Sequence, residues 1–535
     1  MSIYLLKQGH SSENSLNEKH GLALVSNADA IPPKSELWTA GVHTSTPWWQ
    51  GYFGLPDPQK SANLGAILFL PCAGRTFALT FGQTAAQLRD DSYEYDFGLK
   101  VSLNAVDPDK LKSTDTSEPG AGRRQRTQTG ADSAITFFDF DSDSSVMKSI
   151  TGKAKTEYEH LVRHVTGATN LRIGTSVRSE GLVGLCTKLL ELYESTDYRA
   201  SFPDIENLQP VRDPGLISLL DEGIDLFKEN PAPFLMLPEV TEYNEEAYFR
   251  YSGVGSNDLH GELNISDLTT HLVAGEVKTL GPEDLRRIRV MVTDGNGSVR
   301  KSYALYRCLN VENTSTNGSV YILHDGSWYA ARQTFVDEMR AAIRTAIRVS
   351  SLPAFNDARE SEYNSRVADG LSTINLDMTN IAGPGRTALE PADLLRIENG
   401  SVNLYHVKVS TRSSDLSHLF NQGLNSAQLL LSEESAAGRL QAAAADRSEP
   451  PIVDISSFLE TPNIVVRYVV VSRQEPSEGE IQLPFFSQIT FWRVLRAFKM
   501  LRITATLELV KNDRPRKPSK PKERKERSDK GKKRT

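Results

Sequence analysis

The fold of the C-terminal third is decided by residues 389–409, which read LEPADLLRIENGSVNLYHVKV. Two largely apolar runs flank an Asn399-Gly400 turn, a pattern typical of a β-hairpin. Because side chains alternate along a strand, His406 and Lys408 are expected on one face, with Tyr405, Val407 and Val409 packed on the other. The hairpin therefore places Asp393 on one arm and a polar His406/Lys408 pair on the other.

The segments around this hairpin predict further elements. Apolar periodicity predicts helices over Phe335–Val349 and Asp357–Ala368, the second carrying Glu362, and a short strand over Ile374–Met378. After a Ser413-Ser414-Asp415 cap signal, a helix should run from Leu416 to about Leu431. His418, Gln422 and Asn425 would form a polar stripe along it, because their spacing places them on one face.

This order of helix acid, strand, Asp hairpin, x-Lys strand and Gln-bearing helix resembles the PD-(D/E)xK nucleases, the fold of many restriction enzymes. The resemblance implies that Asp393 is a metal-binding carboxylate and Lys408 the catalytic lysine. It also implies that Glu362 is the acid of the leading helix and that Gln422 supports the site. Divalent metal in such a site polarises the phosphate and lowers the pKa of the attacking water, and oxygen ligands suit Mg²⁺.

The sequence departs from the family pattern at His406, which stands where a second metal-binding acid is expected. A neutral imidazole suits Mn²⁺ or other transition metals better than Mg²⁺, so the expected cofactor is Mg²⁺ or Mn²⁺. Glu390 or Glu362 could replace the missing acid. Two alternatives stay open: a degenerate site that only grips nucleic acid, and an unrelated α/β domain with Asp393 at a strand end and His406 and Lys408 on a solvated face.

The rest of the chain predicts an α+β multidomain protein. Strand-like runs at 65–70 and 77–81 indicate an antiparallel sheet, and Asp-Gly or Asn-Gly turns predict β-hairpins over 288–306 and 321–329. The polar stretch 107–132 is expected to be a mobile connection or an exposed loop, and helical periodicity is expected over 154–192.

These patterns predict four parts. They are an N-terminal α+β domain (1–150), a middle mixed helical and β-hairpin domain (151–335), a restriction-endonuclease-like α/β domain (336–511) and a disordered basic tail (512–535). A 535-residue chain is long enough for two to four packed domains of about 100 to 200 residues each.

Composition excludes several classes. The three cysteines, Cys72, Cys186 and Cys308, form no CxxC pair, which argues against a zinc site or a disulfide framework. No stretch approaches the roughly 20 apolar residues of a membrane span, and no signal peptide or phosphate-binding Gly-rich loop is present. Asp96-Phe97-Gly98 copies a kinase tripeptide without its partner motifs and is expected at a strand end. A cytoplasmic protein without membrane contact is predicted.

The net charge of −7 conceals a basic tail. Residues 514–535 hold twelve Lys or Arg and three acids, a net charge of +9, which leaves −16 for the rest of the chain. Such a segment has no apolar residues to bury and can attract phosphate without reading sequence. The candidate nucleic-acid contacts are Arg514, Arg516, Lys517, Lys520, Lys522, Arg524 and Lys525. A solvated tail that only aids solubility is the alternative.

Several blocks along the chain, among them residues 3–7, 75–82, 96–104, 406–408 and 416–423, resemble a sporadically distributed family of uncharacterised prokaryotic proteins. The family often occurs beside restriction and mobile-element genes, which implies a role in antiviral defence. The sequence-based hypothesis is therefore a metal-dependent nuclease acting on DNA rather than RNA, with a defence-system protein or a second copy of the chain as candidate partners. The alternatives are an inactive nucleic-acid-binding or sensor protein and a capsid-like structural protein.

Overall fold

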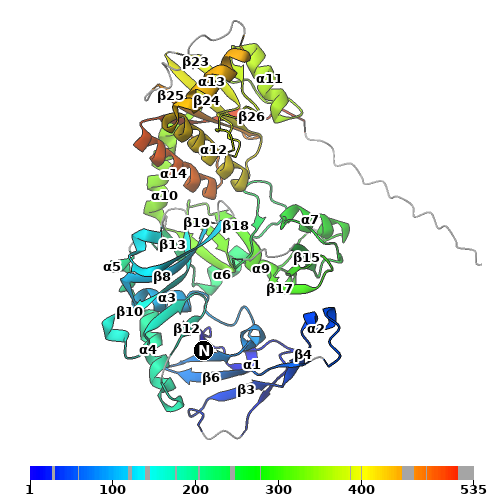
Figure 1. Cartoon of the computed structure of the whole chain (residues 1–535), viewed down its shortest axis with the longest axis vertical. Helices are drawn as coiled ribbons and strands as arrows, with labels where there is room; N and C mark the ends of the chain where they lie inside the picture. Colours follow the sequence, from blue (N-terminus) through cyan, green and yellow to red (C-terminus); the bar gives the residue numbers. More distant parts are fainter. Residues whose placement is uncertain are drawn as a thin grey trace, which may run out of the picture. The chain divides into compact units, whose positions relative to one another are not determined.

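The chain folds into two compact units in the computed structural model, and each is described by itself. Unit 1 comprises Met1–Ile343, Arg412–His418 and Leu483–Leu495, and unit 2 comprises Arg344–Thr411, Leu419–Gln482 and Arg496–Thr535 (Figure 1). The structure describes residues 1–26, 30–57, 59–118, 123–138, 145–174, 177–202, 205, 207–240, 247–277, 279–385, 387–398, 400–448, 463–477 and 479–515. Most of the predicted basic tail, residues 516–535, lies outside the described residues.

A ten-stranded antiparallel sheet forms the larger part of unit 1. Its strand order is β2 (Leu22–Leu24), β3 (Glu36–Ala40), β6 (Ala66–Cys72), β7 (Arg75–Phe81), β1 (Ser2–Leu5), β12 (Leu171–Ile173), β11 (His164–Gly167), β10 (Val146–Ala154), β8 (Val106–Glu118) and β9 (Arg123–Ser133). The predicted strands at 65–70 and 77–81 are confirmed, since β6 and β7 form a hairpin. Short elements accompany the sheet: α1 (Ser12–Ser15), α2 (Trp48–Tyr52), α5 (Tyr198–Ser201), β4 (His43–Ser45) and β5 (Ser61–Asn63).

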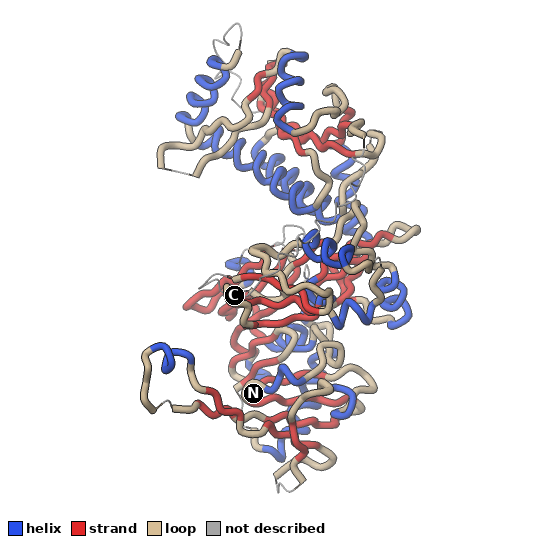
Figure 2. The backbone as a smooth tube through the Cα atoms, turned by 90° about the vertical axis from the view of Figure 1, so that its right-hand side faces the viewer, coloured by secondary structure: helices blue, strands red, loops and turns tan. Residues whose placement is uncertain are grey.

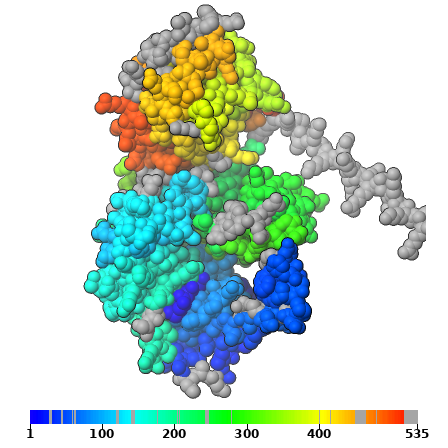
Figure 3. Space-filling model, in the orientation of Figure 1, coloured from blue at the N-terminus to red at the C-terminus, as the bar shows by residue number. Residues whose placement is uncertain are grey.

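Helices α3 (Phe97–Ala105) and α4 (Leu182–Glu194) cover one face of this sheet. Alternate apolar residues of the strands, such as Ile3 and Leu5, point into the same buried cluster. Helix α3 lies very close to β11, because a Cβ added at Gly167 would overlap the carbonyl oxygen of Gly98. The chain from β8 through α5 forms one continuous part of the surface of unit 1, cyan to turquoise in Figure 3.

Two sequence-based expectations for this region are wrong and one is confirmed in part. The described residues of 107–132 form strands rather than a loop, because β8 and β9 pair along most of this stretch. The helical periodicity expected over 154–192 is confirmed by α4, whose Leu182, Leu185, Leu189 and Leu192 are buried, whereas β11 and β12 precede it. The Asp96-Phe97-Gly98 tripeptide begins helix α3 rather than ending a strand. Strands β8 and β9 lack the apolar alternation of a half-buried strand, and cross-strand ion pairs such as Arg126 Nη2 to Asp115 Oδ2 at 2.7 Å stand in its place.

Two smaller antiparallel sheets complete unit 1. One has the order β13 (Leu208–Pro210), β20 (Ser327–Ala331), β19 (Val320–His324), β18 (Leu309–Thr314) and β14 (Phe234–Leu235); the other has β15 (Tyr248–Ser252), β16 (Arg289–Thr293) and β17 (Val299–Ala304). Both predicted hairpins are confirmed, as β16 pairs with β17 and β19 with β20. Asp325, at the second turn, adopts φ +55°, which Asp tolerates in tight turns. The adjoining helices are α6 (Pro214–Glu222), α7 (Ile265–Ala274), α8 (Pro282–Arg287), α9 (Leu305–Cys308) and α10 (Gln333–Ala346).

Unit 2 is built on a six-stranded mixed sheet. Its order is β21 (Ile347–Val349), β26 (Thr504–Lys511), β25 (Ile464–Ser472), β24 (Ser401–Lys408), β23 (Leu394–Glu398) and β22 (Ile374–Asn375). The first four strands are parallel to one another, and β23 and β22 are antiparallel to their neighbours. Figure 2 shows these strands in red and the helices in blue.

Helices lie on both faces of this sheet. Tyr363 and Val367 of α11 (Glu360–Leu371) pack against Tyr405 and Val407 of β24 in one buried cluster. On the opposite face the hydroxyl of Tyr468 donates to the carbonyl oxygen of Phe420 in α12 (Ser413–Ser432) at 2.7 Å. Helices α13 (Glu434–Asp446) and α14 (Phe485–Leu501) complete the set.

The hairpin and the three helices predicted for the C-terminal third are confirmed, although their bounds differ by a few residues. The hairpin of residues 389–409 is β23 and β24, and the predicted helices correspond to α10, α11 and α12. The expected strand over 374–378 is shorter, because Met378 adopts φ +61° and ends the extended conformation. No helix in the described part of the chain has both the length and the apolar character needed to cross a membrane.

Candidate active site

Strands β23 and β24 bring Asp393 next to the residues that precede Lys408 (Figure 1). The backbone N–H of Asp393 donates to the carbonyl oxygen of Tyr405 at 2.9 Å. In the other direction, the backbone N–H of Val407 donates to Asp393 Oδ2 at 2.7 Å. The carboxylate is thus held at the end of the sheet where Lys408 leaves β24, and this follows from the hairpin register Leu394 with Tyr405.

Lys408 is joined to the first residue of helix α11. Its Nζ donates to Glu360 Oε1 at 3.2 Å, and the backbone N–H of Val409 donates to Glu360 Oε2 at 2.9 Å. Both side chains are about one-third exposed, so this ion pair contributes little to stability. Its effect is positional, because it ties the start of α11 to the end of β24. An acid in the first turn of a helix is also favoured by the helix dipole.

Gln422 and Glu390 form a second contact, on the segment leading to Asp393. The Gln422 Nε2 amide of α12 donates to Glu390 Oε2 at 3.2 Å. Both side chains are only partly buried. Helix α12 therefore positions Gln422 beside an acid that lies three residues before Asp393 in the chain.

Burial and nearby acids act on the ionisation of Asp393. Burial raises the pKa of Asp393 to about 7, against the lowering effect of the Val407 N–H, and the charges of Glu360, Asp377 and Glu390 add to the rise. A cation bound at Asp393 would offset both effects and stabilise its charged form.

The residues present could bind Mg²⁺ through one or two carboxylate oxygens. They could not supply all of its ligands. Asp393 Oδ1 has no hydrogen-bond partner among the described side chains and backbone, whereas both oxygens of Glu360 are engaged. No group of three or more His, Cys, Asp or Glu in the described ranges is arranged to hold a metal ion. Mg²⁺ commonly keeps several waters and takes one or two carboxylates plus substrate phosphate, so a single strong ligand at Asp393 suits it.

Glu362 lies apart from this group. Its side chain is exposed, and its Oε2 accepts the backbone N–H of Ala358 at 3.1 Å, ahead of α11. Glu360, two residues earlier, takes the position next to Lys408 instead. The sequence analysis singled out Glu362 and missed Glu360, although α11 carries both acids in its first turn. Only the rotation of α11 against β24 distinguishes the two acids.

His406 is also placed differently from the expectation of a shared polar face. Its side chain is fully buried, and neither Nδ1 nor Nε2 has a hydrogen-bond partner in the part of the chain that the structure describes. Its ring centroid lies 5.8 Å from that of Tyr468. Burial alone lowers the pKa of His406 to about 3, so the ring is neutral, and no carboxylate acts on it. The structure does not bring His406 to the acids around Asp393.

Of the predicted nucleic-acid contacts, only Arg514 is described. Its Nη1 donates to the carbonyl oxygen of Ala358 at 2.8 Å, close to the start of α11. The other tail residues that the sequence singled out, namely Arg516, Lys517, Lys520, Lys522, Arg524 and Lys525, lie outside the described residues. Arg514 therefore lies near the segment that carries Glu360.

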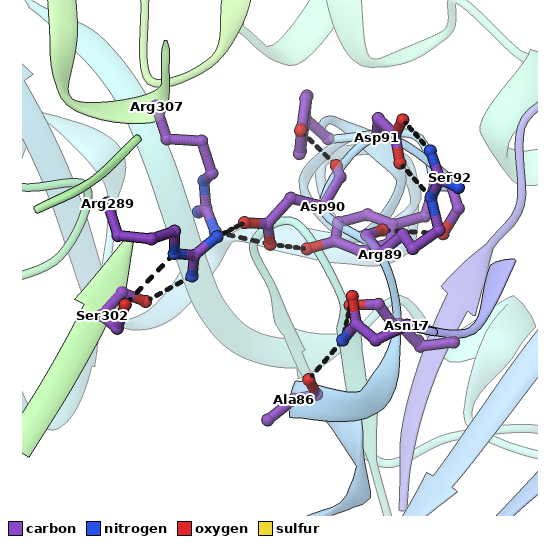
Figure 4. A network of polar contacts seen from close by, with 12 residues as sticks. Asn17, Ala86, Arg89, Asp90, Asp91, Ser92, Arg289, Ser302 and Arg307 are labelled. Carbon is purple, nitrogen blue, oxygen red and sulfur yellow. Dashed lines mark hydrogen bonds and ion pairs between the residues drawn. The ribbon is translucent and has the colours of Figure 1, made fainter. Parts of the chain in front are cut away.

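Unit 1 contains a cavity of about 1410 Å³ that sequence patterns did not indicate. Its lining combines tyrosines such as Tyr4 with charged side chains such as Arg172. Arg307, in its wall, is partly buried and lies 3.4 Å from Asp90, which also lies 3.6 Å from Arg289 (Figure 4). These residues come from separate segments of the chain, so no local motif could reveal the cavity.

The chain is thus a mixed α+β protein with several antiparallel sheets and one mixed sheet. It belongs to the DUF6119 family, a family of unknown function whose model matches residues 1–511. Comparisons with curated proteins and with solved structures give no match.

Proposed function

We propose that the protein is a metal-dependent nuclease, with its active site in unit 2. One observation carries the proposal: Asp393 and Lys408 lie at the same end of the sheet, where Asp393 accepts the N–H of Val407, the residue before Lys408, and Lys408 pairs with Glu360. Opposite placement of the two side chains would have excluded a shared site. A carboxylate with a free oxygen beside a lysine is the minimum that phosphodiester hydrolysis with a divalent ion requires.

The order of elements supports the same proposal. Helix α11 is followed by β22, β23 and β24, then by α12 and by β25, which is parallel to β24. This is the arrangement that the resemblance to PD-(D/E)xK nucleases implies for the core of that fold. Fold alone does not establish activity, and the argument therefore rests on the side chains at the sheet end.

Each residue has a defined task in this proposal. Asp393 Oδ1 would hold the ion, with Mg²⁺ preferred because the donors are oxygens and His406 is not among them; Mn²⁺ would serve as a substitute. When bound, the ion would polarise the phosphate and lower the pKa of the attacking water. Lys408 would orient that water and offset the negative charge that develops on the phosphate. Glu360 positions Lys408, and Gln422 positions Glu390 at the rim.

The first experiment compares the full chain with Lys408→Ala on supercoiled plasmid DNA and on RNA, with Mg²⁺ or Mn²⁺. Lys499→Ala is the matched control, since Lys499 is an exposed lysine of the same unit in α14. We expect the wild type and Lys499→Ala to cut DNA and Lys408→Ala to be at least about a hundredfold slower. Equal cutting by all three proteins, or none with either metal, would contradict the proposal.

We further propose that the substrate is foreign DNA in a defence setting, as the family resemblance implies. Cells that express the wild type should resist phage infection, and cells that express Lys408→Ala at the same level should not. If cells that express Lys408→Ala still resist phage, the defence role does not depend on catalysis by Lys408.

The alternative is an inactive protein that binds nucleic acid or senses a partner. Two observations favour this alternative. Lys408 is already paired with Glu360, and the buried His406 stands where the PD-(D/E)xK nucleases have a second acid. Removing residues 514–535 discriminates between the two, because loss of the +9 tail should weaken DNA binding in a salt-dependent way. A nuclease shortened in this way should still cut at higher protein concentration, whereas a pure binding protein has no cutting to retain.

A further inference from the structure

Two histidines of unit 1 face each other beside helix α7. His260 pairs through its backbone with Phe249 of β15, and His271 lies in the last turn of α7. Their Nε2 atoms are 3.0 Å apart, and both side chains are less than one-fifth exposed. Leu268 and Leu272 of α7 pack with Phe249 in one buried cluster, so the backbone around the pair is well fixed (Figure 1).

A carboxylate stands behind each ring. His260 Nδ1 lies 3.4 Å from Asp267 Oδ2, and His271 Nδ1 lies 3.9 Å from Asp258 Oδ2. In a neutral imidazole one nitrogen donates and the other accepts. A proton on each Nδ1, on the side of the carboxylate, would leave a lone pair on each Nε2. Two imidazole nitrogens at 3.0 Å either share one N–H···N hydrogen bond or bind a common cation through both lone pairs.

We propose that His260 and His271 bind a divalent transition metal ion, such as Zn²⁺, through their two Nε2 atoms. Two ligands at about 2.0–2.1 Å from zinc are about 2.9 Å apart at a right angle and about 3.4 Å apart in a tetrahedron. The observed 3.0 Å falls within this span. Histidine ligands of metals usually donate their other ring N–H to a carboxylate. Asp267 lies on the Nδ1 side of His260 at 3.4 Å, and Asp258 lies on the Nδ1 side of His271 at 3.9 Å, which is beyond hydrogen-bond distance.

The proposed histidine site differs from the site at Asp393 in the metal that it prefers and in its expected role. Imidazole nitrogens favour Zn²⁺, Ni²⁺ or Co²⁺ over Mg²⁺, so the two sites would take different ions. In the described ranges no third His, Cys, Asp or Glu completes the group, which leaves the remaining positions to water or to an outside ligand. Bound metal would also link the segment before α7 to the helix itself and stabilise this part of unit 1.

The test uses the full chain after treatment with a chelator. Co²⁺ and Zn²⁺ are titrated into the wild type, His260→Gln, His271→Gln and the double variant, with His164→Gln as the control because His164 is an exposed histidine on β11. Cobalt absorbance and the shift in Tm with Zn²⁺ are the readouts. We expect one equivalent bound by the wild type and the control, at least tenfold weaker binding by each single variant, and no such site in the double variant.

Two results would overturn the proposal. One is equal metal binding by the wild type and the double variant, which would place the metal elsewhere. The other is no binding of either metal by a wild type with unchanged Tm, together with NMR signals of a proton shared between the two rings. Repeating the titration with Asp393→Asn separates this site from the proposed nuclease site, since that change should leave cobalt binding at the histidines unaltered.

Discussion

The backbone N–H of Val407 donates to Asp393 Oδ2 at 2.7 Å, which fixes the carboxylate while leaving Oδ1 without a partner among the described residues. The strand that ends in Lys408 therefore also orients the acid on the neighbouring strand. This contact depends on the pairing of one hairpin, because Asp393 directly precedes β23 and Val407 lies in β24.

Asp393→Asn should abolish cleavage and change how stability depends on pH. The pKa of Asp393 is raised to about 7 from a usual value of 3.8, so the folded state binds the proton more tightly than the unfolded state. The contribution of the protonated Asp393 carboxyl to stability is complete below a pH of about 4 and is lost as the pH rises to about 7. Asn keeps the bond from Val407, so at pH 8 the variant should be more stable by on the order of 1 kcal/mol.

Denaturant unfolding of both proteins between pH 4 and pH 8 measures this effect. The difference in the free energy of unfolding should grow as pH rises. A variant that is less stable at pH 8 would show that the charged carboxylate is satisfied in the folded protein, and the argument for a cation at this position would fail.

Glu360→Gln and Glu362→Gln should behave differently although the two acids are two residues apart. Glu360 contacts Lys408 and the Val409 N–H, whereas Glu362 is exposed and accepts only the Ala358 N–H. We expect Glu360→Gln to lower kcat at least about tenfold, which corresponds to about 1.4 kcal/mol in the barrier. Glu362→Gln should keep near wild-type kcat, and Tm of both variants shows that each is folded. The reverse order would assign the helix acid to Glu362.

How far the sequence predicts this site depends on the range of the contacts. Alternating apolar residues and an Asn-Gly turn are local signals, and they located the hairpin, the three helices and the pairing of Asp393 with the Lys408 strand. The choice between Glu360 and Glu362 depends on how α11 is rotated against β24, and a local pattern carries no information on that rotation. Strands β8 and β9 escaped detection for a related reason, because ion pairs between strands replace the apolar alternation on which strand prediction relies.

His406 shows the opposite error, in which a correct local pattern led to a wrong environment. Alternation does place His406 and Lys408 on the same side of β24, but helix α12 covers the sheet there, with Phe420 packed on Tyr468, the neighbour of His406 on β25. Only Lys408, at the end of the strand, reaches the sheet edge. The periodicity of a strand gives the side on which a residue lies, and the depth of burial depends on what packs over that side.

His406→Leu should therefore be tolerated, and His406→Asp should not. The buried imidazole has no hydrogen-bond partner in the described structure, a condition that costs about 1–3 kcal/mol. Leucine has a similar volume and should raise the free energy of unfolding by about 1 kcal/mol. An aspartate would bury an unpaired carboxylate and should lower it by about 3 kcal/mol or more. Gain of cleavage in His406→Asp, without loss of stability, would contradict this placement.

The pH dependence of the same position gives a second check. The pKa of His406 is lowered to about 3 from 6.5, so the unfolded state binds the proton more readily than the folded state. Stability contributed by the neutral ring is complete above pH of about 6.5 and is lost as pH falls toward 3. His406→Leu should flatten this part of the stability profile, measured by denaturant unfolding at successive pH values.

Glu312, in unit 1, provides a last prediction. It is a buried acid on β18, and its two oxygens accept the backbone N–H groups of Phe485 and Phe486 at 2.7 and 2.9 Å, at the start of α14. Burial nevertheless raises the pKa of Glu312 to about 7. Because an acid with a raised pKa binds its proton more tightly when folded, this group makes the protein less stable as pH rises from about 4.5 to about 7.

Glu312→Gln should remove this dependence of stability on pH. It should also cost about 1–2 kcal/mol at pH 5, since one N–H loses its acceptor to the amide group. Unfolding measured at pH 5 and pH 8 should therefore show a smaller difference in the variant than in the wild type, and an unchanged difference would mean that Glu312 stays ionised in the folded protein.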